Sequence, residues 1–150
     1  EADLSPGLLH HHFTDKAEML DALVADLRAR FGERLRRHDL ATDDGIEAYV
    51  DAALKLDAGA DVLAARCWVG IFSEAMRSPS LFKRMRRFVD SETQTIQSRS
   101  GGKLSSHDAS AVLAFVIGAL VVGAFAPRRA AGFAAPSLRK MIAGLRGGAR

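Results

Sequence analysis

Three consecutive histidines, His10, His11 and His12, are the side chains of this protein with the clearest capacity for chemistry. Imidazole is a common zinc ligand, so the triplet raises the question of a metal site. Successive residues of an α-helix point about 100° apart, so three neighbouring side chains on one helix cannot share an ion. The single Cys67 excludes an internal disulfide and a four-cysteine zinc site. We expect no metal and no cofactor.

No pattern in the chain predicts catalysis. The sequence contains no H-E-x-x-H motif, no glycine-rich phosphate loop after a strand and no nucleophile elbow. Its acidic group at Asp43, Asp44, Glu47 and Asp51 falls on or near the start of a predicted helix, where negative charge is favourable. We therefore expect a protein that is not an enzyme.

A second set of residues could form a binding site. Large apolar side chains recur in three predicted helices, and they are Trp68, Phe72, Met76, Met85, Phe88 and Phe115. Such residues either fill a core or line a cavity, and their spacing does not separate the two cases. Polar side chains that could anchor a ligand occur on the same predicted helices, at Arg66, Cys67, Ser73, Glu74 and His107.

Hydrophobic periodicity predicts that helices position these side chains. Apolar residues recur at helical spacing in segments 16–37, 45–56, 60–77, 79–97, 106–126 and 136–145. The segment 60–77 is apolar nearly all round, which predicts a central, buried helix. Residues 127–136 are predicted to form a loop. No segment shows the alternation typical of a strand, so the predicted fold class is all-α.

Size and composition fit one helical domain with a small appendage. The chain has 150 residues, of which 48% are apolar, enough to bury a substantial core. A net charge of +3 permits contact with nucleic acid without requiring it. The chain begins at Glu1 and shows no signal peptide there. We expect a cytoplasmic protein and an N-terminal segment that this sequence lacks.

The most apolar segment, 109–126, is long enough to span a bilayer. Its flanks lack an aromatic belt, so a helix buried in protein explains it better than a membrane span. Small side chains recur in it at four-residue steps, which lets two helices approach closely. The neighbour is either the helix predicted at 60–77 of the same chain or a second copy of the segment across a two-fold axis.

The sequence near the start has the form of a very short helix, a bend and a long helix. Ser5 is a good N-cap and Pro6 suits the first helical position, while Asp15 and Glu18 form a capping pattern for the helix that follows. The run from Leu4 to Leu20 resembles the end of the DNA-binding domain of TetR-family (tetracycline-repressor-like) transcriptional regulators. That family has approximately the pattern G-V-S-x-G-x-L-Y-x-H-F-x-x-K-x-x-L. The matching residues here are Ser5, Gly7, Leu9, His12, Phe13 and Lys16, whereas Asp3 replaces a turn glycine and His10 replaces a tyrosine.

The resemblance implies a TetR-like helical bundle with a partial helix-turn-helix at its N-terminus. Residues 1–38 would be the remnant of the DNA-binding domain with its linking helix, and residues 39–150 a ligand-sensing and dimerisation domain. The DNA contacts would be Ser5, Pro6, Gly7, His10, His11, His12 and Lys16. The ligand pocket would lie among Trp68, Phe72, Met76, Met85, Phe88 and Phe115. The dimer interface would be formed by the last two helices, with Ala114, Gly118, Ala119, Val122, Gly123, Leu138, Met141 and Ile142.

The implied function is a ligand-responsive transcriptional regulator, expected to be a repressor. It would bind operator DNA as a homodimer, respond to a small-molecule effector and not enter a membrane. Two alternatives stay open. One is a helical ligand-binding bundle or enzyme without a role on DNA, and the other is a dimerising interaction domain. Sequence upstream of Glu1 would discriminate among them, since only the regulator requires two further helices there.

Overall fold

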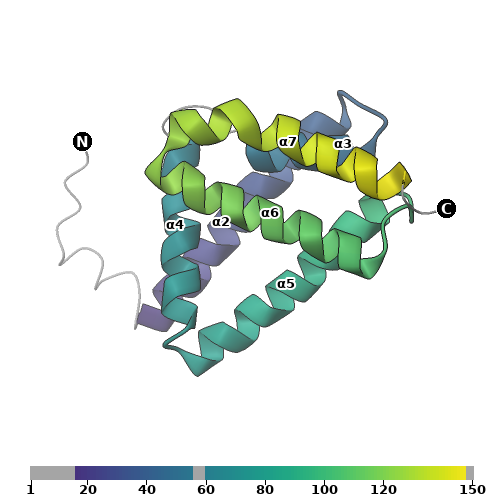
Figure 1. Ribbon diagram of the computed structural model, residues 1–150. Helices are drawn as coiled ribbons and strands as arrows, with labels where there is room; N and C mark the ends of the chain where they lie inside the picture. Colours follow the sequence, from purple (N-terminus) through teal and green to yellow (C-terminus); the bar gives the residue numbers. More distant parts are fainter. Residues whose placement is uncertain (1–15, 56–59, 148–150) are drawn as a thin grey trace.

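Helices account for nearly all of the structure that positions these residues. The computed structural model describes residues 16–55 and 60–147, and within these ranges it contains no strand, which confirms the predicted all-α class. The helices are α2 (Lys16–Asp39), α3 (Gly45–Leu54), α4 (Ala60–Ala75), α5 (Pro79–Arg99), α6 (Ser106–Phe125) and α7 (Pro127–Gly147), as Figure 1 shows. Five of the six helix starts agree with the sequence periodicity, and only α7 begins earlier than predicted.

The central helix is α6, which packs against α3, α4, α5 and α7. Ser105 and Asp108 form a capping box that begins it, each side chain accepting the other residue's backbone N–H. The prediction that segment 60–77, which contains α4, is the central buried helix is wrong. Leu63 on α4 is 63% exposed and Met76 just after it is 76% exposed, so α4 has an outward apolar face.

The predicted loop at residues 127–136 is also wrong, because α7 runs through it. Pro127 occupies the first helical position, where its missing N–H costs nothing. Alanine, the strongest helix former, follows at four of the next eight positions and outweighs the signals for a loop. Pro136 lies inside α7 on its exposed side, and Ala130, Ala134 and Leu138 are buried against the rest of the bundle.

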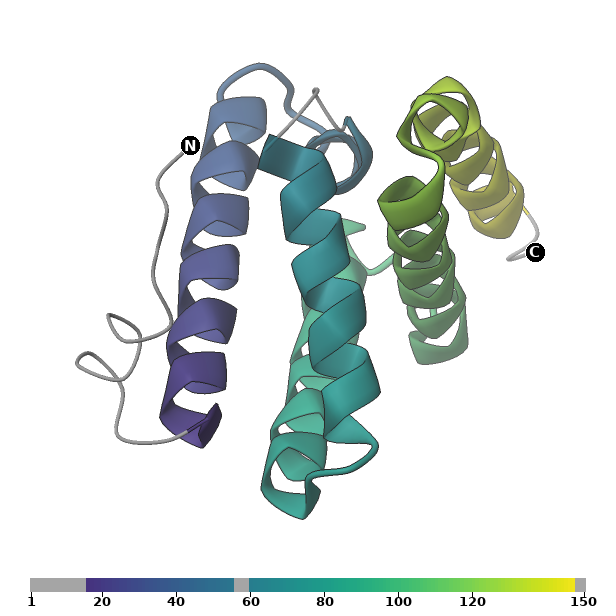
Figure 2. The same ribbon diagram turned by 90° about the vertical axis from the view of Figure 1, so that its left-hand side faces the viewer.

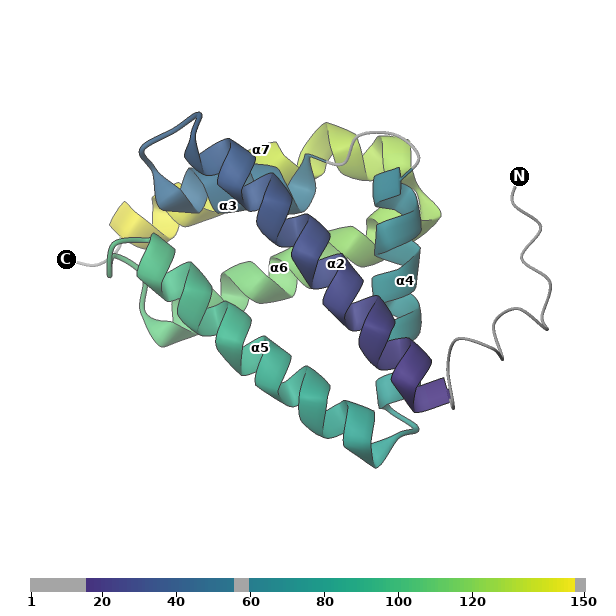
Figure 3. The ribbon, with the colours of Figure 1, turned by 180° about the vertical axis from the view of Figure 1, so that it is seen from behind.

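Two groups of buried residues make up the interior. The larger is built around α3, with Ile46, Tyr49 and Val50, and extends over α5, α6 and α7. The smaller lies between α2, α4 and α5 and contains Ile71, Leu81 and Met85. Helix α2 contributes to both, through Leu35 in the larger core cluster and Leu27 in the smaller one. Figure 3 shows α2 crossing diagonally from α3 to the junction of α4 and α5.

Ion pairs fix α3 and α5 to their neighbours at the edges of the larger core cluster. Arg139 of α7 donates to Glu47 of α3 at 2.6 Å and also pairs with Asp51 one turn further along. Arg99 of α5 pairs with Asp39 at the end of α2 at 2.7 Å. Exposed pairs of this kind contribute at most about 1 kcal/mol each, so burial supplies most of the stability.

Candidate ligand-binding site

A cavity of about 470 Å³ lies where the two core clusters meet. Its walls come from α2, α4, α5 and α6, and α3 closes one end with Tyr49 and Ala53. Small-molecule sites in proteins typically have volumes of about 300–1,000 Å³ and mostly apolar walls. The cavity is therefore large enough for an organic molecule. Figure 2 shows α2 and α4, two of these walls, side by side.

Aromatic rings line the end of the cavity nearest the smaller core cluster. Trp68 of α4 stacks on Phe88 of α5 with ring centroids 5.0 Å apart, and on Phe72 at 5.9 Å. Toward α3, the edge of Phe31 meets the ring of Tyr49 at 5.6 Å and an interplanar angle of 80°. Helix α6 completes the apolar wall with Leu113, Val116, Ile117 and Leu120. These walls can hold a flat, apolar body.

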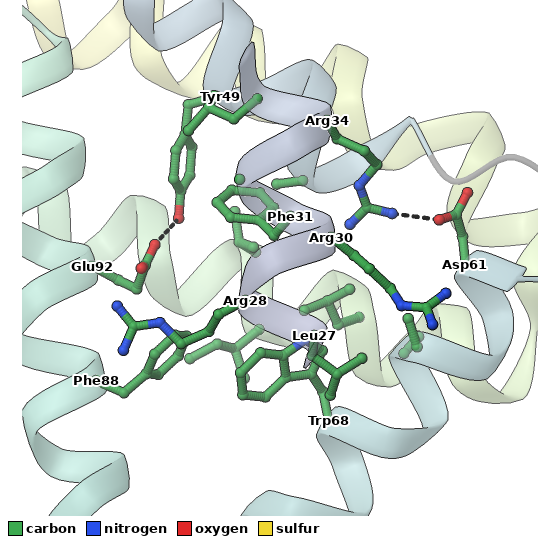
Figure 4. Close-up of a pocket in the computed structure, with 18 of the residues that line it drawn as sticks. Leu27, Arg28, Arg30, Phe31, Arg34, Tyr49, Asp61, Trp68, Phe88 and Glu92 are labelled. Atoms are coloured by element: carbon green, nitrogen blue, oxygen red, sulfur yellow. Dashed lines mark hydrogen bonds and ion pairs between the residues drawn. The ribbon is translucent and has the colours of Figure 1, made fainter. Parts of the chain in front are cut away.

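A buried carboxyl group lies between these aromatic rings (Figure 4). Glu92 of α5 is only 9% exposed, and the Tyr49 hydroxyl donates to its Oε2 at 3.2 Å. Burial raises the pKa of Glu92, while the Tyr49 hydrogen bond and the positive charges of Arg28 and Arg99 act in the opposite direction. Burial likewise raises the pKa of Tyr49 well above its ordinary value, so Tyr49 keeps its proton and serves as a donor.

Arginines of α2 supply the charge around the rest of the cavity. The guanidinium of Arg28 lies over the Phe88 ring, 5.7 Å from its centroid, on the side of Glu92. Arg34 pairs with Asp61 of α4 and so connects the two helices that border the cavity. Arg30 also lines the cavity, and its Nε donates to Asp26 at 2.8 Å.

Three of the six predicted pocket residues line this cavity, namely Trp68, Phe72 and Phe88. The other three, Met76, Met85 and Phe115, do not line it. Met76 is 76% exposed because α4 has already ended, and Met85 is buried inside the smaller core cluster. Phe115 packs against the larger core cluster from a face of α6 that does not reach the cavity.

The polar residues considered from the sequence do not line the cavity: Arg66, Cys67, Ser73, Glu74 and His107. Arg66, for example, donates to the carbonyl of Ala124 at 3.1 Å and borders a shallow hollow elsewhere. Glu92 was overlooked, although a signal for it exists. It continues the inward stripe of α5 that contains Met85, Phe88 and Ile96, and a carboxylate on such a stripe indicates either a partner or a site.

Most of the predicted DNA contacts lie outside the described residues: Ser5, Pro6, Gly7, His10, His11 and His12. Lys16 is described as the first residue of α2, and its side chain is 65% exposed. Its Nζ donates to Oε1 of Glu74 at 2.7 Å, and this bond lowers the pKa of Glu74. Within residues 16–55 and 60–147 no three histidine, cysteine or acidic side chains gather as metal ligands would.

The predicted dimer residues fall into two groups. Ala114 and Gly118 are exposed, and Val122 and Met141 are half-buried. The remaining four, Ala119, Gly123, Leu138 and Ile142, are buried within the subunit, where α6 and α7 pack on each other and on α3. The outward side of α6 instead carries what we term the α6 surface stripe, formed by Ala111, Ala114, Gly118, Val121 and Phe125.

Among the described residues, α6 is long and apolar enough to cross a bilayer, a property that core helices of soluble proteins share. Comparison of the chain with protein-family models, with curated proteins and with solved structures gives no match.

Proposed function

We propose that this protein is a ligand-responsive DNA-binding transcriptional regulator, a repressor, in which a small molecule in the cavity alters operator binding. Residues Ser5, Gly7, His12 and Lys16 carry the sequence resemblance on which the DNA-binding part depends. The cavity and the exposed side of α6 supply the other two requirements, a place for an effector and a surface for a second copy.

The observation that carries this proposal is the position of α2. This helix begins at Lys16, directly after the segment that resembles a recognition helix, and nine of its residues line the cavity. A molecule that enters the cavity therefore contacts the helix that leads to the DNA-binding residues. Ligand binding in the cavity and binding to DNA can therefore be coupled through α2 alone.

The anchoring of α2 is uneven, which gives the coupling a direction. Its second half is held by Leu35 in the larger core cluster and by the pair of Asp39 with Arg99. Its first half is attached by the polar pairs of Lys16 with Glu74 and Asp21 with Arg84. The apolar residues Leu20, Leu23 and Val24 there are only partly buried against the smaller core cluster. A ligand that separates α2 from α4 would thus displace the first half most. Allosteric coupling of this kind is typically worth about 1–3 kcal/mol.

A second copy is part of the proposal because helix-turn-helix proteins read paired half-sites. These are about 34–36 Å apart, or a multiple of that distance, so a tilt of α2 in both subunits changes the fit to DNA. The α6 surface stripe supports a two-fold contact, since it is apolar and small-sided along most of its length and ends in Phe125, which is 80% exposed.

The test is sequence-specific DNA binding by the native, full-length protein. The protein is mixed with a random duplex library and the retained DNA is sequenced. We expect an inverted repeat, bound far more tightly than unrelated DNA at physiological salt. Binding that is indifferent to sequence and vanishes as salt rises would contradict the proposal. A protein that is monomeric and ligand-binding, or dimeric without DNA binding, would instead support one of the two alternatives given by the sequence.

A further inference from the structure

We propose that the cavity binds a lipophilic cation with planar N–H donors, an amidinium or guanidinium on a flat apolar body, whose charged group pairs with Glu92 and replaces the Arg28 guanidinium over the Phe88 ring. This inference rests on the proposed function, because it names the chemical class of the effector that would occupy the same cavity.

The acceptor for such a cation is the carboxylate of Glu92. The Tyr49 hydroxyl occupies only one of its two oxygens, Oε2. Among the residues that the structure describes, none donates a hydrogen bond to Oε1, although the side chain lines the cavity and is 91% removed from solvent. An acceptor left open in an apolar enclosure favours a ligand that brings its own N–H donors.

The chain itself shows which donor fits. Arg28 places its guanidinium over the Phe88 ring, on the side where Glu92 lies (Figure 4). Its positive charge acts to lower the pKa of Glu92, although Arg28 and Glu92 form no direct ion pair among the described residues. Arg28 is an exposed residue, so its side chain can move outward into solvent and leave the ring face and the carboxylate to a ligand.

The apolar body of the ligand has a defined place beside this cation. Trp68 and Phe72 continue the aromatic wall from Phe88, and Ile117 and Leu120 of α6 also line the cavity. A planar ring between these walls would stack on Trp68 while its amidinium reaches Glu92. Cation–π attraction to the Phe88 face adds to the ion pair.

A ligand of the opposite charge is disfavoured inside the cavity. An anion near Phe88 would face the carboxyl of Glu92, and burial strengthens that repulsion. Two of the arginines that line the cavity already have carboxylate partners, since Arg30 pairs with Asp26 and Arg34 with Asp61. Arg28 thus joins effector binding to α2, because the arriving cation displaces a side chain of that helix.

The experiment compares three probes of one shape: para-phenylbenzamidine, para-phenylbenzamide and para-phenylbenzoate. The chain contains one tryptophan, Trp68, so its fluorescence reports occupancy of the cavity directly, with calorimetry as a second measurement. We expect the amidine to bind at least about tenfold tighter than the neutral amide, since a charge-assisted hydrogen bond is worth about 1.5–3 kcal/mol. Equal affinities, or tightest binding of the benzoate, would overturn the proposal.

Two variants assign the effect to the named residues. Glu92→Gln should reduce the amidine to the affinity of the amide and leave the amide unchanged, whereas Asp90→Asn, the same charge change on the exposed side of α5, should alter neither. Arg28→Gln should strengthen amidine binding alone, because it removes the competing cation. If Glu92→Gln does not fold, Arg28→Gln decides, and unchanged selectivity in it counts against the proposal.

The outcome is separable from that of the proposed function. If the amidine is preferred but its binding leaves DNA binding unaffected, the cation site stands and the regulatory role fails. If the protein binds a specific DNA sequence but shows no preference for the amidine, the regulatory role stands and the cation site fails.

Discussion

Replacing Gly118 with leucine tests the proposed dimer with two effects of opposite sign. Gly118 is exposed near the middle of the α6 surface stripe, and a Cβ built on it meets no atom within 4 Å. The substitution therefore does not disturb the subunit. Leucine also favours a helix interior over glycine by about 0.5–1 kcal/mol, so each isolated subunit should become slightly more stable.

The effect on association should be much larger. At a close contact between two copies of α6, each new side chain would force the helices apart, and overpacking of one site costs about 1–3 kcal/mol. The two-fold axis places the change on both subunits, giving about 2–6 kcal/mol in total. That corresponds to a dissociation constant raised by roughly 30-fold to more than 10,000-fold.

Analytical ultracentrifugation over a range of concentrations measures the dissociation constant, and urea unfolding under monomeric conditions measures subunit stability. Ala25→Leu, on the exposed face of α2, is the matched control that adds a similar side chain elsewhere. An unchanged dimer in Gly118→Leu would refute the α6 interface. Loss of subunit stability would refute the claim that Gly118 lies in open space.

Further predictions concern stability. Leu138→Ala should cost about 2–5 kcal/mol in urea unfolding, because Leu138 is fully buried between α7 and its neighbours. Ser105→Ala should cost about 1 kcal/mol by removing the cap of α6, and Ser106→Ala, one residue later, should cost less. The hydrogen bond from Arg99 lowers the pKa of Asp39 below its ordinary 3.8, so this carboxylate stabilises the fold above about pH 4, and Asp39→Asn should reduce the stability lost as pH falls below that value. Burial raises the pKa of Glu92 above its ordinary 4.5, so stability should fall as pH rises through the interval just above 4.5, and Glu92→Gln should remove that slope.

Periodicity and caps were sufficient to locate most of the helices. Ser78 and Pro79 are good examples, because Ser78 caps α5 by accepting the N–H of Leu81 and Pro79 follows in the first turn, at the start of the predicted segment 79–97. The start of α7 could not be found in this way. Its prolines and arginines are typical of a loop, and the alanines between them prevail only because α6 and α3 offer a surface on which Ala130 and Ala134 are buried.

The burial of each helix was harder to predict than its position. An exposed apolar residue of α4, such as Leu63, cannot be told from a buried apolar residue by its type alone, so the sequence pattern predicted a buried helix. The cavity poses the same difficulty, since Trp68 and Met85 are both large and apolar and only the packing of α2 over α4 shows that Trp68 borders a space. Glu92 could have been predicted as a site residue from the sequence, because it lies on an otherwise apolar stripe of α5.

The uneven anchoring of α2 has a consequence for its motions. Only Leu27 and Leu35 are buried along its 24 residues, Leu27 at the midpoint of the helix and Leu35 in its second half. The backbone amides of the first three turns should therefore exchange with deuterium at a lower opening free energy than those near Leu35. A molecule bound between Phe31 and Trp68 would add contacts to α2 from Leu27 onward, directly after these three turns. If binding of that molecule slows amide exchange in the first half of α2, then occupancy of the cavity controls how rigid this helix is.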